Sequence, residues 1–172
     1  VARGPHLQAL QTQGLTLTQN TEGTWNLPAE ASARELDLDD HTVILLAMKT
    51  DDTFDAMEQH SSIYRDLPVV CCQNGVTNEE WLSARGYKTY GCTVMVGAEI
   101  THPGTVRHSG GKLLEIGGWP SGSGEISEAL VSDLDASGMD ASVDERIIDG
   151  KWGKLVRNLA NAYLALTDLS VQ

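Results

Sequence analysis

The sequence predicts an α/β fold with a doubly wound parallel sheet, and two apolar runs carry this prediction. Val43–Met48 is an unbroken apolar run that stops at Lys49, a pattern typical of a parallel strand buried on both faces. Pro68–Cys72 repeats the pattern and ends at the polar tip Gln73–Gly75. A helical segment follows each run, so that strand, polar tip and helix occur twice. Such βαβ units form sheets that bind ligands at the carboxyl ends of their strands.

The other elements follow from periodicity and from turn residues. Helices are expected at residues 6–14, 53–62, 78–85 and 126–137, and further strands at 15–18, 92–98 and 139–143. Polar or Gly/Ser/Pro-rich turns are expected at residues 20–23 and 119–124. Pro103–Gly104 and Gly110–Gly111 interrupt the intervening segment, which predicts a hairpin of residues 105–108 and 112–116 after the strand at 92–98. The sequence shows no internal repeat.

Composition excludes several classes of function. A chain of 172 residues, 41% of them hydrophobic, can bury an ordinary core without disulfides. The formal charge of −12 argues against a broad nucleic-acid surface, because phosphate binding requires clustered cations. The three cysteines and five histidines show neither a disulfide framework nor a metal-ligand spacing, so reduced thiols in the cytoplasm and no metal are expected. No apolar run reaches membrane-spanning length, and no signal peptide opens the chain.

The segment Asp149–Asn161 places a lysine and two amides on one side of a predicted helix. At about 100° per residue, Lys154, Asn158 and Asn161 fall within roughly 60° of one another. Apolar residues gather on the other side: Trp152, Leu155, Leu159, Tyr163 and Leu166. Asparagine is unfavourable inside a helix because its side chain competes for the backbone, so the two amides favour a site for a carbonyl or hydroxyl ligand. The alternative is a solvated face on a core-packing helix.

The two strand tips offer further polar groups. Asn74–Gly75 is typical of a tight turn, and a lysine after a strand, such as Lys49, is commonly just solvated. Successive parallel strands nevertheless deliver both groups to one edge of the sheet. Their joint placement therefore favours a ligand site at that edge.

Five segments together carry a resemblance to a known family. They are Ala2–Leu7 with Gly14–Leu17, Leu46–Thr50, Gln73–Glu80, Pro103–Gly110 and Trp152–Asn158. In this order and at these intervals they resemble the ketopantoate reductases (2-dehydropantoate 2-reductases) over nearly the whole sequence.

The resemblance implies a domain organisation. Family members begin with a strand and a GxGxxG-type loop, which this sequence does not contain, so it reads as an internal fragment. Residues 1–148 then form a partial, incomplete Rossmann-like NADP-binding domain. Residues 149–172 begin an all-helical domain for substrate binding and dimerisation, which leaves a homodimer open.

The resemblance also implies cofactor contacts. Arg3 matches the family arginine that binds the adenosine 2′-phosphate and favours NADPH over NADH, and Lys49 matches a lysine that assists it. A further family contact, a glutamine, is Asp52 here, whose carboxylate would repel the phosphate. The choice between NADPH and NADH therefore stays open.

For the substrate, the resemblance assigns the catalytic role to Lys154. Asn158 matches an amide that holds the substrate, and Asn74 matches a contact near the nicotinamide and the substrate. Two family positions differ: a glycine is Thr77 here, and a later asparagine is Ala162, with Asn161 beside it.

The implied reaction is the NADPH-dependent reduction of 2-dehydropantoate to pantoate, a step of pantothenate and coenzyme A biosynthesis. The expected partner is thus a small 2-oxo acid, with no nucleic acid and no membrane. Two alternatives remain: a related NAD(P)-dependent reductase of another 2-oxo acid, and a dinucleotide-binding regulator without turnover.

Overall fold

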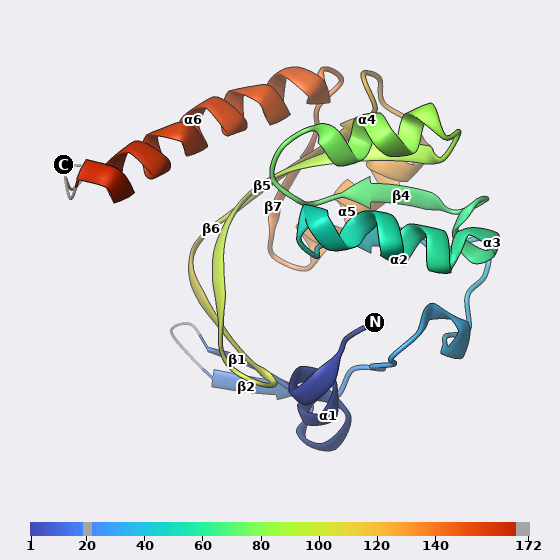
Figure 1. Ribbon diagram of the computed structural model, residues 1–172, viewed down its shortest axis with the longest axis vertical. Coiled ribbons are helices and arrows are strands. Elements are labelled where there is room, and N and C mark those ends of the chain that lie inside the picture. The colour runs from blue at the N-terminus through green and yellow to red at the C-terminus, as the bar shows by residue number, and fades with distance from the viewer. Residues whose placement is uncertain (19–21, 168–172) are drawn as a thin grey trace. The chain divides into compact units, whose positions relative to one another are not determined.

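The computed structural model describes residues 1–18 and 22–167, which fall into two compact units. The first unit comprises Val1–His41 and Met95–Lys112, and the second comprises Thr42–Val94 and the chain from Leu113 onward. Two long strands, β5 (Lys88–His102) and β6 (Thr105–Gly118), contribute to both units (Figure 1). The predicted boundary near residue 148 concerns a different division and stays a prediction.

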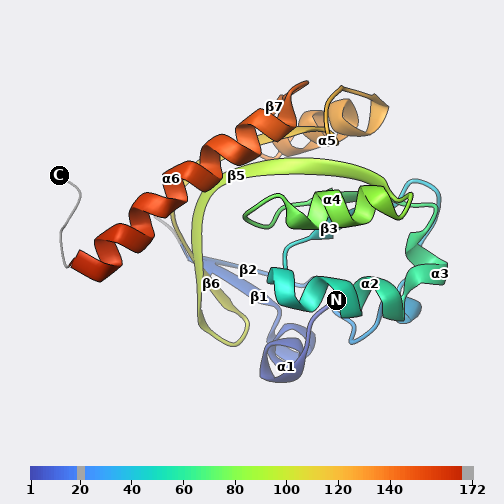
Figure 2. The same ribbon diagram turned by 45° about the horizontal axis from the view of Figure 1, so that its top comes forward.

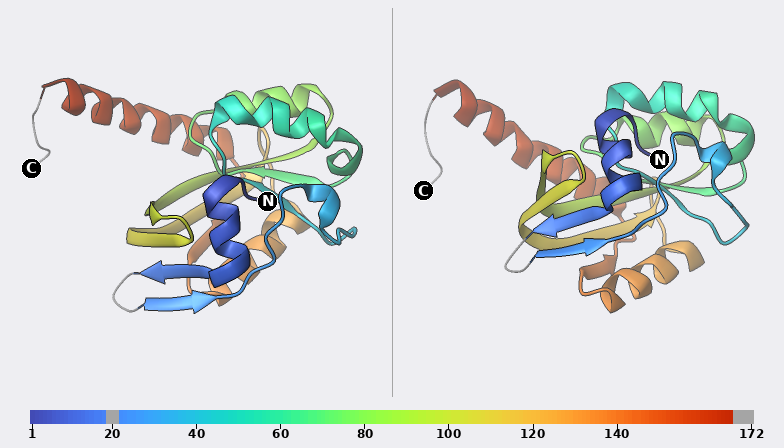
Figure 3. Two further views of the ribbon diagram at one scale, coloured as in Figure 1. Left: turned by 60° about the horizontal axis from the view of Figure 1, so that its bottom comes forward. Right: turned by 90° about the horizontal axis from the view of Figure 1, so that it is seen from below.

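The first unit is built around a short hairpin. It contains α1 (Gly4–Gln13), β1 (Leu15–Thr18), β2 (Glu22–Trp25) and the 3-10 turn η1 (Ala33–Glu35). β1 pairs antiparallel with β2 and parallel with the first residues of β6. Helix α1 lies against this hairpin (Figure 3), and the main-chain N–H of Gly104, between β5 and β6, donates to His6 Nδ1 of α1 at 3.0 Å.

The second unit holds the predicted βαβ units. Its elements are β3 (Ile44–Leu46), η2 (Thr50–Asp52), α2 (Thr53–Gln59), α3 (Ser61–Tyr64), β4 (Pro68–Cys71), α4 (Thr77–Ala84), α5 (Glu125–Ala136), β7 (Asp140–Val143) and α6 (Ile147–Thr167). Strands β3, β4 and β5 pair in parallel in that order, and β7 pairs in parallel with β6. The α/β, Rossmann-like class predicted from the sequence is confirmed, with a mixed sheet.

Helices cover both faces of this sheet. Figure 2 shows α2 and α4 on one face and α5 on the other. Successive side chains of a strand point to opposite faces. The full burial of both Val69 and Val70 of β4 therefore shows that both faces are covered there. Val70 joins Cys92 and Ile116 in a core cluster. That cluster packs against partly buried apolar residues of α5: Leu130, Val131 and Leu134.

Two local predictions are wrong, and a third falls partly outside the described residues. The hairpin turn lies at Pro103–Gly104, and β6 runs unbroken through Gly110–Gly111, where Gly111 adopts a φ of 72°. β3 is not buried on both faces: it pairs with β4 alone among the described strands, and Leu45 is 53% exposed. Residues 20 and 21 of the predicted polar turn lie outside the described residues, while Gly23 belongs to β2.

Glycines let α6 begin close to the sheet. Ile147, the first residue of α6, is fully buried. A Cβ on Gly91 of β5 would come within 2.8 Å of its Cγ1. A Cβ on Gly117 of β6 would lie 2.0 Å from the carbonyl oxygen of Asp144. A Cβ on Gly150 would lie 3.1 Å from Thr93 Oγ1 of β5. The first turns of α6 are therefore packed against β5 and β6.

Two glycine substitutions should change stability in opposite directions. Gly117→Ala should lower the free energy of unfolding by about 1–3 kcal/mol, because its methyl group would overlap the main chain at Asp144. Gly153→Ala in α6 meets no atom within 4 Å and should raise the free energy by up to about 1 kcal/mol through helix propensity. Urea unfolding of both variants measures the two effects. A Gly117→Ala protein as stable as the wild type would contradict this account of the packing.

Candidate functional site

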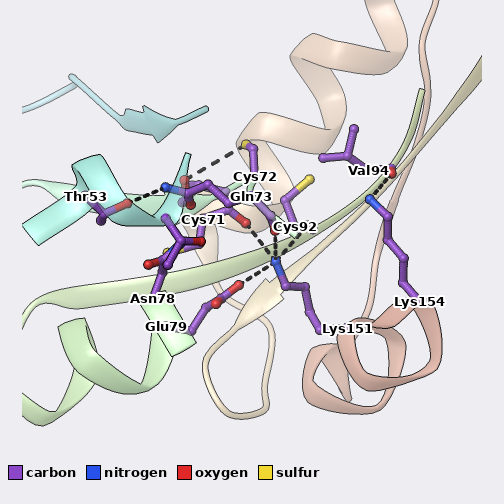
Figure 4. A network of polar contacts seen from close by, with 12 residues as sticks. Thr53, Cys71, Cys72, Gln73, Asn78, Glu79, Cys92, Val94, Lys151 and Lys154 are labelled. Atoms are coloured by element: carbon purple, nitrogen blue, oxygen red, sulfur yellow. Dashed lines mark hydrogen bonds and ion pairs between the residues drawn. The ribbon is translucent and has the colours of Figure 1, made fainter. Parts of the chain in front are cut away.

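Lys154 lies in the second turn of α6, where its side chain reaches β5. It is half-buried, and its Nζ donates a hydrogen bond to the carbonyl oxygen of Val94 (Figure 4). Burial lowers the pKa of Lys154, and the nearby positive charge of Lys151 lowers it further. A lysine with a depressed pKa, held against β5, releases its proton more readily than an ordinary lysine and is suited to give a proton to a ligand.

Lys151, one turn earlier in α6, is buried in a cage of acceptors. Its Nζ lies 2.6 Å from Glu79 Oε1, and these side chains are 2% and 1% exposed. It also donates to the carbonyl oxygen of Gln73 at 2.6 Å and to those of Cys71 and Cys92 at 3.4 Å each. β4 ends at Cys71, which pairs with Gly91 of β5. The carbonyls of Cys92 and Val94, which the two lysines of α6 bind, come after Gly91 and therefore lie in the part of β5 that β4 does not cover.

The burial of Glu79 has an electrostatic consequence. Loss of water raises the pKa of this carboxyl group, and the charge and hydrogen bond of Lys151 oppose that rise. Without the ammonium, the carboxylate would be a buried, uncompensated charge. The two side chains therefore depend on each other.

Polar side chains connect the loops that follow β3 and β4. Gln73 Nε2 donates to Thr53 Oγ1 at 3.0 Å, and Asn78 Nδ2 donates to Thr50 Oγ1 at 3.2 Å. Phe54 of α2 and Trp81 of α4 bring their ring centroids to 4.4 Å. The segments that follow β3 and β4 are thus held together by side-chain contacts.

The sequence-predicted residues of the second unit lie on these elements. Lys49 is exposed after β3, at the start of η2, and Asn74 is exposed after β4. Gly75 has a φ of 83°, as the tight turn at Asn74–Gly75 requires. Asn158 is half-buried in α6, one turn after Lys154.

Two predicted residues stand apart from this group. Arg3 is exposed at the start of α1 in the first unit. Asn161 falls within α6, but its side chain lies outside the described residues. The predicted apolar side of α6 is largely exposed where it is described: Trp152 is 48% and Leu159 63% exposed, while Leu155 is half-buried.

Sequence reasoning missed Lys151 and Glu79. Lys151 lies three residues before Lys154, so the pair shares one side of the helix, and this spacing was the available signal. Glu79 stands in the acidic first turn of α4, which alone indicates an ordinary helix start. Within the described chain, no helix has the length and apolarity to cross a bilayer. The same residues contain no grouping of three or more His, Cys, Asp and Glu side chains suited to a metal ion.

Comparison with known proteins identifies the family to which this sequence and fold are similar. Residues 1–121 match the family model described as ketopantoate reductase PanE/ApbA. The 2-dehydropantoate 2-reductase of Pyrococcus horikoshii is 32% identical over 93% of this chain and 52% of its own length. The chain thus spans about half the length of the curated relatives it matches.

Solved structures give the same result. A PanE/ApbA family ketopantoate reductase from Ralstonia eutropha superposes with a TM-score of 0.83 at 29% identity, over 98% of this chain and 56% of that one. A D-mandelate dehydrogenase solved with NADH and anilino(oxo)acetate shares the fold, with a TM-score of 0.69 at 23% identity, over 83% of this chain and 47% of that one. The family model and the sequence identity together establish that the chain belongs to the ketopantoate reductase family.

Proposed function

We propose that the whole protein reduces 2-dehydropantoate to pantoate with NADPH, with Lys154 as the catalytic residue. The observation that carries the proposal is the placement of Lys154: half-buried, with a lowered pKa, and hydrogen-bonded to a carbonyl of β5. Membership of the family supplies the substrate class. A cytoplasmic location and a homodimer are further parts of this proposal.

The residues at the strand ends fit a dinucleotide. Lys49 and Asn74 are exposed after two neighbouring parallel strands, where α/β sheets bind such ligands. Lys49 offers a cation to a phosphate, and Asn74 offers both a donor and an acceptor. The nicotinamide, when bound, supplies the hydride.

The protein residues then stabilise the charge that develops on the substrate and orient the substrate. The Lys154 ammonium donates a hydrogen bond to the ketone oxygen and stabilises the negative charge that grows there. It gives its proton to that oxygen, so that ketone, hydride and proton together become the alcohol. Asn158, one turn away, and Asn74 hold polar groups of the substrate.

The direct test is the oxidation of NADPH by the whole protein, followed as the loss of nicotinamide absorbance, with a panel of 2-oxo acids. The proposal expects ketopantoate to give the highest kcat/KM. A higher value with another 2-oxo acid would identify a related reductase instead. Cofactor binding without turnover of any substrate in the panel would identify a non-catalytic regulator.

Arg3→Ala tests the choice of cofactor. If the guanidinium binds the 2′-phosphate, the variant should lose about 1.5–3 kcal/mol of binding free energy for NADPH and little for NADH, which lacks that phosphate. Calorimetric titration of both cofactors measures the difference. The titration with NADH is needed because Asp52 disfavours a phosphate and so leaves the cofactor preference open. Equal losses of binding free energy for both cofactors would show that Arg3 does not bind the 2′-phosphate.

A further inference from the structure

The buried ion pair of Lys151 and Glu79 has no part in the reaction described above. Both side chains are almost wholly withdrawn from water. Removing two charges from water costs about as much as their attraction returns, so a pair of this kind is weak evidence for stability by itself. What distinguishes this pair is the set of elements that it joins together.

The acceptors around Lys151 come from three separate elements. Glu79 belongs to α4, Cys71 ends β4, and Cys92 belongs to β5. Gln73, whose carbonyl lies at 2.6 Å, immediately precedes Asn74. An ammonium has three protons to donate, and these acceptors occupy them all. Lys151 therefore has no donor left for a ligand and cannot act on a substrate directly.

Lys151 is also coupled to Lys154. The two lysines stand one turn apart in α6 and bind the carbonyls of Cys92 and Val94, two residues apart in β5 (Figure 4). The positive charge of Lys151 helps to lower the pKa of Lys154. The other groups acting on Lys154 are Arg157 of its own helix, Cys92 of β5 and Cys72 after β4.

Resting on the proposed reductase function, we propose that Lys151 is a positioning residue. Held by Glu79, it ties the main chain beside Asn74 to the helix turn that carries Lys154. A single buried ammonium thereby sets the separation between the amide that orients the ligand and the lysine that protonates it.

The first test needs no turnover. In the whole protein, Lys151→Met/Glu79→Gln removes both charges together and keeps side chains of similar size. NMR of the Lys154 side chain should show that its pKa rises, because a neighbouring cation has gone, and the main-chain amide signal of Asn74 should shift. Lys112→Met, which removes an exposed lysine of β6, is the matched control and should change neither signal. Unchanged Lys154 and Asn74 signals in the double variant would overturn the proposal.

The second test is kinetic and separates positioning from folding. The double variant should show a kcat at least tenfold lower, with an unaltered circular dichroism spectrum. A wild-type kcat would overturn the positioning role. If the double variant does not fold, Glu79→Gln replaces it: the unneutralised Lys151 should then lower the pKa of Lys154, and an unchanged value would overturn the proposal. A wild-type protein that reduces no 2-oxo acid would refute the proposed function, while the NMR arm would still decide the role of Lys151.

Discussion

Lys154→Ala should lower the turnover of the enzyme at least about 100-fold. Loss of a single donor to the developing negative charge typically costs roughly 2.7–4 kcal/mol of transition-state stabilisation. Binding of the cofactor should barely change, because Lys154 is assigned to the ketone. Steady-state kinetics with ketopantoate, together with calorimetric titration of NADPH, measure both quantities.

Two further variants make this result interpretable. Lys112→Ala removes an exposed lysine and should leave kcat unaltered. Asn158→Ala should raise KM as well as slow turnover, because a substrate-holding amide acts in both states. If Lys154→Ala keeps more than about a tenth of wild-type turnover on its best substrate, the helix has only a packing role and the mechanism fails.

Breaking the Lys151–Glu79 pair from one side should give the largest loss of stability. Lys151→Met should lower the free energy of unfolding by about 3–5 kcal/mol, because it leaves a buried carboxylate without its cation. Lys151→Met/Glu79→Gln should recover much of that loss, since no charge is then stranded. Urea unfolding at neutral pH compares the three proteins. Equal losses for the single and double variants would show that the ammonium's main-chain bonds, rather than the ion pair, dominate.

The pH dependence of the single variant has a defined sign. Burial already raises the pKa of Glu79 above its ordinary value of 4.5, and removal of Lys151 takes away the group that opposes this rise. A carboxyl whose pKa is raised by folding destabilises the folded state only above the pKa that it has in the unfolded chain. The deficit of Lys151→Met that arises from Glu79 should therefore be absent below pH 4.5 and develop as pH rises through the folded-state pKa. A deficit of constant size down to acid pH would argue against a stranded carboxylate.

The sequence predicted the repeated strands and helices well where one pattern dominated. The wholly apolar run of β4 is buried on both faces, and α4 and α5 begin within one residue of their predicted starts. It failed at Gly110–Gly111, because two glycines are compatible both with a turn and with a strand that passes through a local distortion. Only the pairing of β6 with its neighbours decides between these conformations.

The candidate site was predictable in part for the same reason. Lys49 and Asn74 follow apolar runs, and Lys154 and Asn158 share a helix side, so local spacing located them. The Glu79–Lys151 contact joins residues far apart in the sequence, and its strength depends on a burial that no local pattern encodes. Whether Asn161 substitutes for the family residue at Ala162 stays a prediction, because its side chain is outside the described residues.

The hydrogen bond from Lys154 to Val94 fixes the direction of the ammonium without using up its donors. An ammonium has three protons, and the carbonyl oxygen of Val94 engages one of them, which leaves protons for a ketone oxygen. In the proposed mechanism the substrate therefore does not have to displace the main chain: it meets a donor that is already held in place. The resting contact thus removes part of the side-chain freedom that would otherwise be lost when the substrate binds.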